Sequence, residues 1–139
     1  MKTPQDVAKA IGDYGCCAFV ALWALGIEPK TDAEAIELVA EAMEKGAVEK
    51  DCTVKWIEFA RLFTGKNIKV EFMEIKSLID LNKKKSICGR IPVRFDYDGN
   101  SHWVGVEDGK VAFNPLEKSR CVEYGKPTKA RIMTWQKLF

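Results

Sequence analysis

Residues 16–25 read CCAFVALWAL, an apolar run that follows the turn-forming residues 13–15 and stops at Gly26. A helix built from this run would be apolar on every side, which is typical of a helix buried in a core rather than of an amphipathic surface helix. Glycine frequently ends helices because it adopts the left-handed conformation without strain. The sequence therefore predicts a buried central helix from Cys16 to Leu25.

Further helices are predicted around it in the first half of the chain. Each begins near a residue that can cap the first turn, and each ends at a glycine. They are expected from Pro4 to Gly12 after Thr3, from Thr31 to Gly46 with Glu34 completing a capping box, and from Asp51 or Thr53 to Gly65. In the last of these, the side chains expected to be buried are Trp56, Ile57, Ala60, Leu62 and Phe63.

From Asn67 onward the apolar residues alternate with polar ones, as they do in a strand with one solvated face. A short helix is expected over residues 77–84. Strands are then predicted over 91–95, 102–106 and 110–113, joined by the turns DYDGNS and EDG, with possible edge strands at 122–124 and 130–134. Helices first and antiparallel strands later predict an α+β fold.

The chain has 139 residues, a length that suits one domain, with a helical half over about 1–65 and a sheet half over about 66–139. Its net charge is +2, from 22 basic and 20 acidic residues whose signs are mixed along the chain. No field that would attract a polyanion is implied, so we do not expect a nucleic-acid partner.

The five cysteines are odd in number and lack the paired CxxC spacing of zinc and redox sites. We find no apolar run of signal-peptide or membrane-span length, so a reducing cytoplasm with free thiols, and no membrane partner, is expected. One histidine, scattered cysteines and no glycine-rich phosphate loop predict neither a metal nor an organic cofactor. The oligomeric state is left open.

His102 is the single histidine, and it stands at the boundary between a turn and a strand. Histidine is the usual general base near neutral pH, so this position favours a functional role. The alternative is a hydrogen-bonded structural histidine beside a strand. Trp103 follows it and, because strands alternate faces, is expected on the opposite side from His102.

Cys16 and Cys17 lie where a turn leads into the predicted buried helix. A helix N-terminus stabilises negative charge, which lowers the pKa of a thiol there and populates the reactive thiolate. The alternative is that both are small apolar residues packed in a core. Cys52, Cys88 and Cys121 have no comparable setting, and we expect them to be structural.

Asn114 ends the strand that forms a hairpin with the strand of His102, so the two side chains can meet across neighbouring strands. An amide there could orient the imidazole. The alternative is that Asn114-Pro115 only initiates a turn.

The segments GCCAFVAL (15–22) and HWVGVEDGKVAFNPL (102–116) resemble two motifs of papain-like cysteine peptidases, the nucleophile helix and the His-strand, hairpin and Asn-strand. The similarity is greatest to compact bacterial and phage members, such as bacteriocin-leader peptidases. The resemblance implies a papain-like fold in which Cys16 is the nucleophile, His102 the general base and acid, and Asn114 the orienting residue.

The register leaves two candidate nucleophiles. Gly15-Cys16 matches the entry of the family's helix and is preferred, whereas Cys17 would place the small residue Ala21 four positions on. The family usually carries a Gln about six residues before the nucleophile as an oxyanion donor, but Ala10 or Ile11 stands there. A backbone amide, Tyr14 or Asn100 could replace it.

The function implied is hydrolysis of a peptide or isopeptide bond through an acyl-enzyme, with a peptide or protein as substrate. The absent Gln supports an alternative, a papain-like binding or accessory protein of phage or mobile-element type with weak or no turnover. Acyl transfer to an amine would use the same residues.

Overall fold

The computed structural model describes residues 16–115 and 119–136. The predicted helix from Pro4 to Gly12 lies outside these residues. The helices are α2 (Cys16–Ala24), α3 (Asp32–Glu44), α4 (Trp56–Thr64) and α5 (Arg120–Tyr124), with the 3-10 turns η1 (Leu78–Leu81) and η2 (Ile87–Gly89). The strands are β1 (Ile68–Glu74), β2 (Arg90–Tyr97), β3 (Asn100–Glu107), β4 (Lys110–Phe113) and β5 (Lys126–Trp135).

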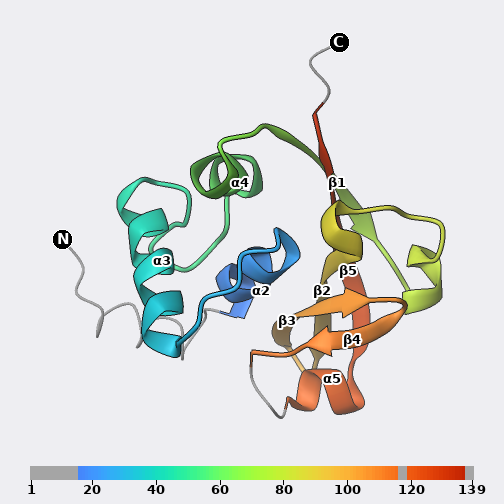
Figure 1. Ribbon diagram of the computed structural model, residues 1–139. Coiled ribbons are helices and arrows are strands. Elements are labelled where there is room, and N and C mark those ends of the chain that lie inside the picture. Colours follow the sequence, from blue (N-terminus) through green and yellow to red (C-terminus); the bar gives the residue numbers. More distant parts are fainter. Residues whose placement is uncertain (1–15, 116–118, 137–139) are drawn as a thin grey trace.

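The helices of the first half lie beside an antiparallel sheet, and α2 stands between α3 and that sheet (Figure 1). The described part of the sheet has the strand order β1-β5-β2-β3-β4. The α+β architecture predicted from the sequence is therefore present. No helix among the described residues has the length and apolar character needed to cross a bilayer.

Helix α2 is close to the predicted central helix. Its residues from Cys17 to Ala24 are buried except for Phe19 and Trp23, which are half-buried, and Gly26 follows with a φ of +79°. The buried face packs with α3, α4 and the inner sheet residues in one hydrophobic cluster. The sequence of α2 is apolar on all sides because neighbours cover it on all sides.

Helix α3 begins as predicted, with the Thr31 hydroxyl accepting from the Glu34 amide at 3.1 Å. The predicted capping box is wrong in one respect. The Glu34 carboxylate accepts from the amide of Lys30, at 3.3 Å, rather than from that of Thr31. The side chain therefore satisfies the amide just before the cap.

Helix α4 begins at Trp56, later than either predicted start. Asp51 and Thr53 are used in a turn, where the Asp51 carboxylate accepts from the Thr53 amide at 3.0 Å, and Val54 pairs with Val48. Lys55 caps α4 without a side-chain hydrogen bond.

The expected buried side of α4 is also partly wrong. Ile57 is 43% exposed, whereas Phe59 is fully buried and shares the inner face with Trp56 and Ala60. Trp56, Phe59 and Ala60 share one face because they stand at i, i+3 and i+4, whereas Ile57 is turned about 100° away from Trp56.

Two predicted edge strands are also corrected. Val122–Tyr124 belong to helix α5, and residues 130–134 belong to β5, which lies inside the sheet between β1 and β2. The predicted helix over 77–84 is the shorter 3-10 turn η1, with Ser77 and Asp80 forming its capping box.

The two sheet faces carry different clusters. Alternation along β3 sends Val104 and Val106 to a cluster that includes Cys121 of α5 and Leu81 of η1, whereas Trp103 packs on the α2 side. The β2–β3 hairpin is regular from Arg90↔Glu107 to Tyr97↔Asn100. This hairpin fixes the faces on which the candidate site residues lie.

Candidate active site

His102 and Asn114 are joined by a hydrogen bond, with 2.6 Å between His102 Nε2 and Asn114 Oδ1. His102 is the third residue of β3, and Asn114 directly follows β4, its hairpin partner. The register of β3 with β4 shifts between Gly105 and Val106, and this irregularity lies between the turn and the pair. The contact predicted from the hairpin is present.

The hydrogen bond determines which imidazole nitrogen carries the proton. An amide oxygen only accepts, so Nε2–H of His102 donates to Oδ1 of Asn114. In the neutral ring the other nitrogen, Nδ1, is then the acceptor. His102 is only 3% exposed. The arrangement therefore favours the tautomer in which Nε2 carries the proton and Nδ1 the lone pair.

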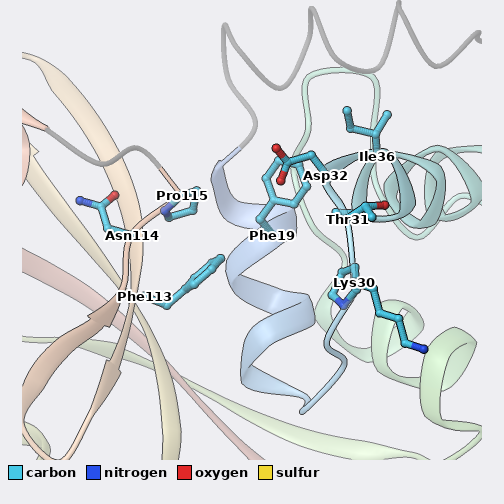
Figure 2. Close-up of a pocket in the computed structure, with 10 residues that line it drawn as sticks. Phe19, Lys30, Thr31, Asp32, Ile36, Phe113, Asn114 and Pro115 are labelled. Carbon is cyan, nitrogen blue, oxygen red and sulfur yellow. The ribbon is translucent and has the colours of Figure 1, made fainter.

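Asn114 also borders a pocket of about 510 Å³ between the end of β4 and the starts of α2 and α3. We call it the Asn114 pocket; its lining includes Phe19, Thr31, Ile36, Phe113, Asn114 and Pro115. Figure 2 shows Phe113 pointing toward α2 and Asn114 pointing away from that helix. Phe19 of α2 and the Phe113–Pro115 segment therefore border the same pocket, while the Asn114 side chain points away from the helix.

Cys17 lies at a different place. It is 8% exposed and borders a second pocket, of about 610 Å³. We call this the arginine pocket; its lining includes Cys17, Trp56, Phe72, Arg94, Trp103 and Arg131. Trp103 alternates with His102 along β3, so the residues of the arginine pocket and the imidazole leave the strand on opposite faces. The structure does not bring Cys17 together with His102.

The other candidates are placed as follows. Cys16 is the first residue of α2, its side chain lies outside the described part of the structure, and Tyr14 lies outside it entirely. Asn100 is exposed at the start of β3 and pairs with Tyr97. The side chains of Cys52 and Cys121 are buried, and that of Cys88 is exposed.

Arg131 is the charged residue that sequence reasoning missed. Burial lowers the pKa of its guanidinium, the nearby Cys17 sulfur raises that pKa, and the positive charge of Arg94 lowers it again, so that the pKa lies below its ordinary value. Arg94 and Arg131 each stand between apolar residues in a strand, in Val-Arg-Phe and Ala-Arg-Ile. The stem of an arginine at such a position packs on a half-buried apolar surface. An arginine between two apolar strand residues is therefore the sequence signal that could have identified the pocket.

A polar network lies next to the histidine. Burial raises the pKa of the Asp96 carboxyl, but hydrogen bonds from Ser101 at 2.6 Å and Thr128 at 2.8 Å, together with Arg94, outweigh it, and the pKa lies below its ordinary value. Ser101 immediately precedes His102. The network therefore ties the strand end that carries the imidazole to β2 and β5.

Within residues 16–115 and 119–136 no group of three or more His, Cys, Asp or Glu side chains is arranged to hold a metal ion. The chemistry that these residues offer is that of a positioned imidazole and of thiols. Comparison of the chain with protein-family models, with curated proteins and with solved structures finds no match.

Proposed function

We propose that the chain is a cysteine peptidase or amidase with a papain-like plan, acting on a peptide or isopeptide bond. Cys16 is the nucleophile, His102 the general base and acid, and Asn114 the residue that orients the imidazole. The proposal places the protein in a reducing cytoplasm, where the thiol remains free.

The observation that carries the proposal is the hydrogen bond between Nε2–H of His102 and Oδ1 of Asn114, at 2.6 Å. An imidazole held in one tautomer by a third group is what a thiol nucleophile requires of its base. A buried histidine that served only the core could be satisfied by any acceptor. Here the acceptor also borders a hollow large enough for several substrate atoms.

The reaction follows from these assignments. Nδ1 of His102 takes the proton of the Cys16 thiol, and the thiolate attacks the substrate carbonyl carbon, forming a carbon–sulfur bond. The carbon–nitrogen bond then breaks, and the leaving amine receives the proton from His102. Water next attacks the thioester while giving a proton to His102, the carbon–sulfur bond breaks, and the proton returns to the sulfur.

Helix α2 supports the choice of Cys16 because that residue is its first. The unpaired amides of a helix start favour a thiolate and can also donate to the oxyanion that forms during attack. This source of donors suits a chain that lacks the upstream Gln. The Asn114 pocket, bordered by Phe19 and Phe113, would receive the apolar part of the substrate beside the attacked bond.

The test is alkylation by iodoacetamide as a function of pH, with each cysteine located by mass spectrometry. We expect Cys16 to react rapidly well below pH 8, the range in which an ordinary thiol is protonated. Labelling should slow in His102→Ala. Cys17→Ala serves as the matched control and should leave the fast site unchanged.

A second function, peptide binding without turnover, is favoured by one observation. Cys17, the neighbouring thiol, faces the arginine pocket and not the imidazole. If all cysteines react slowly and at the same rate in the wild type and in His102→Ala, the peptidase proposal fails and the binding function replaces it. Fast labelling at Cys17 alone would identify Cys17 as the nucleophile in place of Cys16, and this too would contradict the proposal.

A further inference from the structure

The arginine pocket contains a half-buried cation, the Arg131 guanidinium, which lies near the Cys17 sulfur. The Arg131 guanidinium lies over two rings, 4.2 Å from the centroid of Phe72 and 5.1 Å from that of Trp103. Its Nη1 donates to the carbonyl of Ala130, at 3.2 Å. Among the described residues no carboxylate lies within ion-pair distance of Arg131. Stacking on rings offsets only part of the cost of burying such a charge.

A second guanidinium shares the pocket. Arg94 lies directly across from Trp103 in the β2–β3 register, and its charge acts unfavourably on that of Arg131. Its Nη2 is paired with the Asp96 carboxylate at 3.1 Å. In the described part of the chain, the Nε atoms of Arg94 and Arg131 are buried without a hydrogen-bond partner. An anion entering here would relieve repulsion and gain charge-assisted hydrogen bonds.

Aromatic side chains form the walls next to these cations, and Asp51, Lys55 and Glu58 also line the pocket. Trp56 and Trp103 lie against each other, with 5.8 Å between ring centroids, and both line the pocket. Phe72 of β1 is 66% exposed. A concave surface that combines aromatic side chains with convergent polar groups is typical of a ligand site.

We propose that the arginine pocket binds the C-terminal carboxylate of a peptide whose last side chain is apolar, with the carboxylate on Arg131 and the side chain against Trp103 and Trp56. The site goes beyond the proposed function, since it requires neither Cys16 nor His102 to react.

The close spacing of cation and ring is the reason for choosing a peptide C-terminus. Trp103 touches the Arg131 guanidinium, so a ligand must carry its anionic and apolar groups on neighbouring atoms. In a C-terminal residue the carboxylate and the side chain leave the same carbon. In an internal Asp or Glu the carboxylate ends the side chain itself and has no apolar group beside it.

The experiment measures binding of three short peptides by calorimetry and by tryptophan fluorescence. The probes are N-acetyl-Phe-Leu as the free acid, N-acetyl-Phe-Leu-amide, and N-acetyl-Phe-Glu-amide, each checked by chromatography to remain intact. We expect the free acid to bind about tenfold more tightly than either amide, the size of one charge-assisted hydrogen bond. In Arg131→Met this advantage should disappear.

Arg90→Met is the matched control. Arg90 also lies over a tryptophan, 4.7 Å from the centroid of Trp23, but it is not part of the arginine pocket. Its replacement should leave the preference for the free acid intact. If Arg131→Met does not fold, the Nε–H resonance of Arg131 in the ¹⁵N-labelled wild type gives the answer, because it should shift with the free acid and not with the amide.

Several results would overturn the inference. Equal binding of the free acid and its amide to the wild type would show that no carboxylate is recognised. Tighter binding of the Phe-Glu amide would assign the pocket to an acidic side chain. Inorganic phosphate binding as tightly as the peptide acid would mean that the aromatic walls contribute nothing.

Discussion

Gly105 of β3 lies directly against the indole ring of Trp23 in α2, so closely that a Cβ at position 105 would overlap the ring carbons Cζ3 and Cε3. Trp23 is also held from other sides. It stacks on Phe113 of β4, with 5.7 Å between centroids and 9° between planes, and the Arg90 guanidinium lies 4.7 Å from its centroid. Helix α2 is thus seated on β3, on the face of the strand that carries Trp103 and not on the face of His102.

Gly105→Ala is therefore expected to destabilise the fold by about 1–3 kcal/mol, as overpacking of a filled site does. The measurement is urea unfolding followed by circular dichroism. Because the added methyl group meets the ring of Trp23, the cost should fall in a Trp23→Leu background, and a double-mutant cycle measures this coupling. Equal costs in the two backgrounds would mean that Trp23 can move aside.

Asn114→Ala should lower kcat/KM for a cleavable peptide roughly ten- to a hundredfold, the cost of losing about 1.5–3 kcal/mol of hydrogen bonding to a charged imidazolium. Asn114→Asp keeps an acceptor 2.6 Å from Nε2 and should retain most of the activity. The pH–rate profile separates a positioning role from a purely structural one, because its basic and acidic limbs should shift in Asn114→Asp. Identical loss in both variants would contradict the assigned role.

Part of the fold could be predicted because it depends on local pattern. The apolar run after Gly15 gave helix α2, and the turns at Asp98-Gly99 and Asp108-Gly109 gave the β2–β3–β4 hairpins. The His102–Asn114 contact followed from the hairpin alone, since neighbouring strands bring such residues together. These features needed no information about distant parts of the chain.

What could not be predicted depends on pairing between distant segments. β5 lies inside the sheet because Val93 and Val70 pair with Ala130 and Met133 from opposite sides, and neither partner can be read from the pattern of residues 130–134. The arginine pocket was missed for the same reason. Its two guanidiniums come from β2 and β5 and meet only after those strands pair.

Substitutions at the starts of α3 and α4 should change the stability of the fold in opposite directions. Thr31→Ala removes the hydroxyl that accepts from the Glu34 amide and should destabilise the fold by about 1 kcal/mol. Lys55→Asp adds a capping carboxylate to α4, whose present cap has no side-chain hydrogen bond, and should stabilise the fold by roughly 0.5–1 kcal/mol. Thermal melts measure both. A loss of stability in Lys55→Asp would indicate that the lysine has another structural role.

The carboxyl of Asp96 should make stability depend on pH in the acid range. Its pKa in the folded protein lies below the value of 3.8 that is usual for an unfolded chain, because hydrogen bonds from Ser101 and Thr128, with the charge of Arg94, outweigh the opposing effect of burial. A depressed pKa means that the folded state binds fewer protons than the unfolded one. The stabilisation is therefore present above pH 3.8 and is lost as the pH falls through the folded pKa.

Asp96→Asn should consequently cost stability at pH 7, by roughly 0.5–1 kcal/mol for a partly exposed and solvent-screened pair. The difference between wild type and variant should shrink as the pH is lowered below 4 or so, since the wild-type carboxyl is then protonated. Urea unfolding at several pH values between 7 and 2.5 measures it. Ser101→Ala removes the hydrogen bond of 2.6 Å to this carboxylate. In the wild type it should lower the free energy of unfolding by part of the cost of Asp96→Asn. In the Asp96→Asn background the same substitution should lower it by less. If the difference between wild type and Asp96→Asn stays constant across this pH range, the carboxylate does not stabilise the strand end that carries His102.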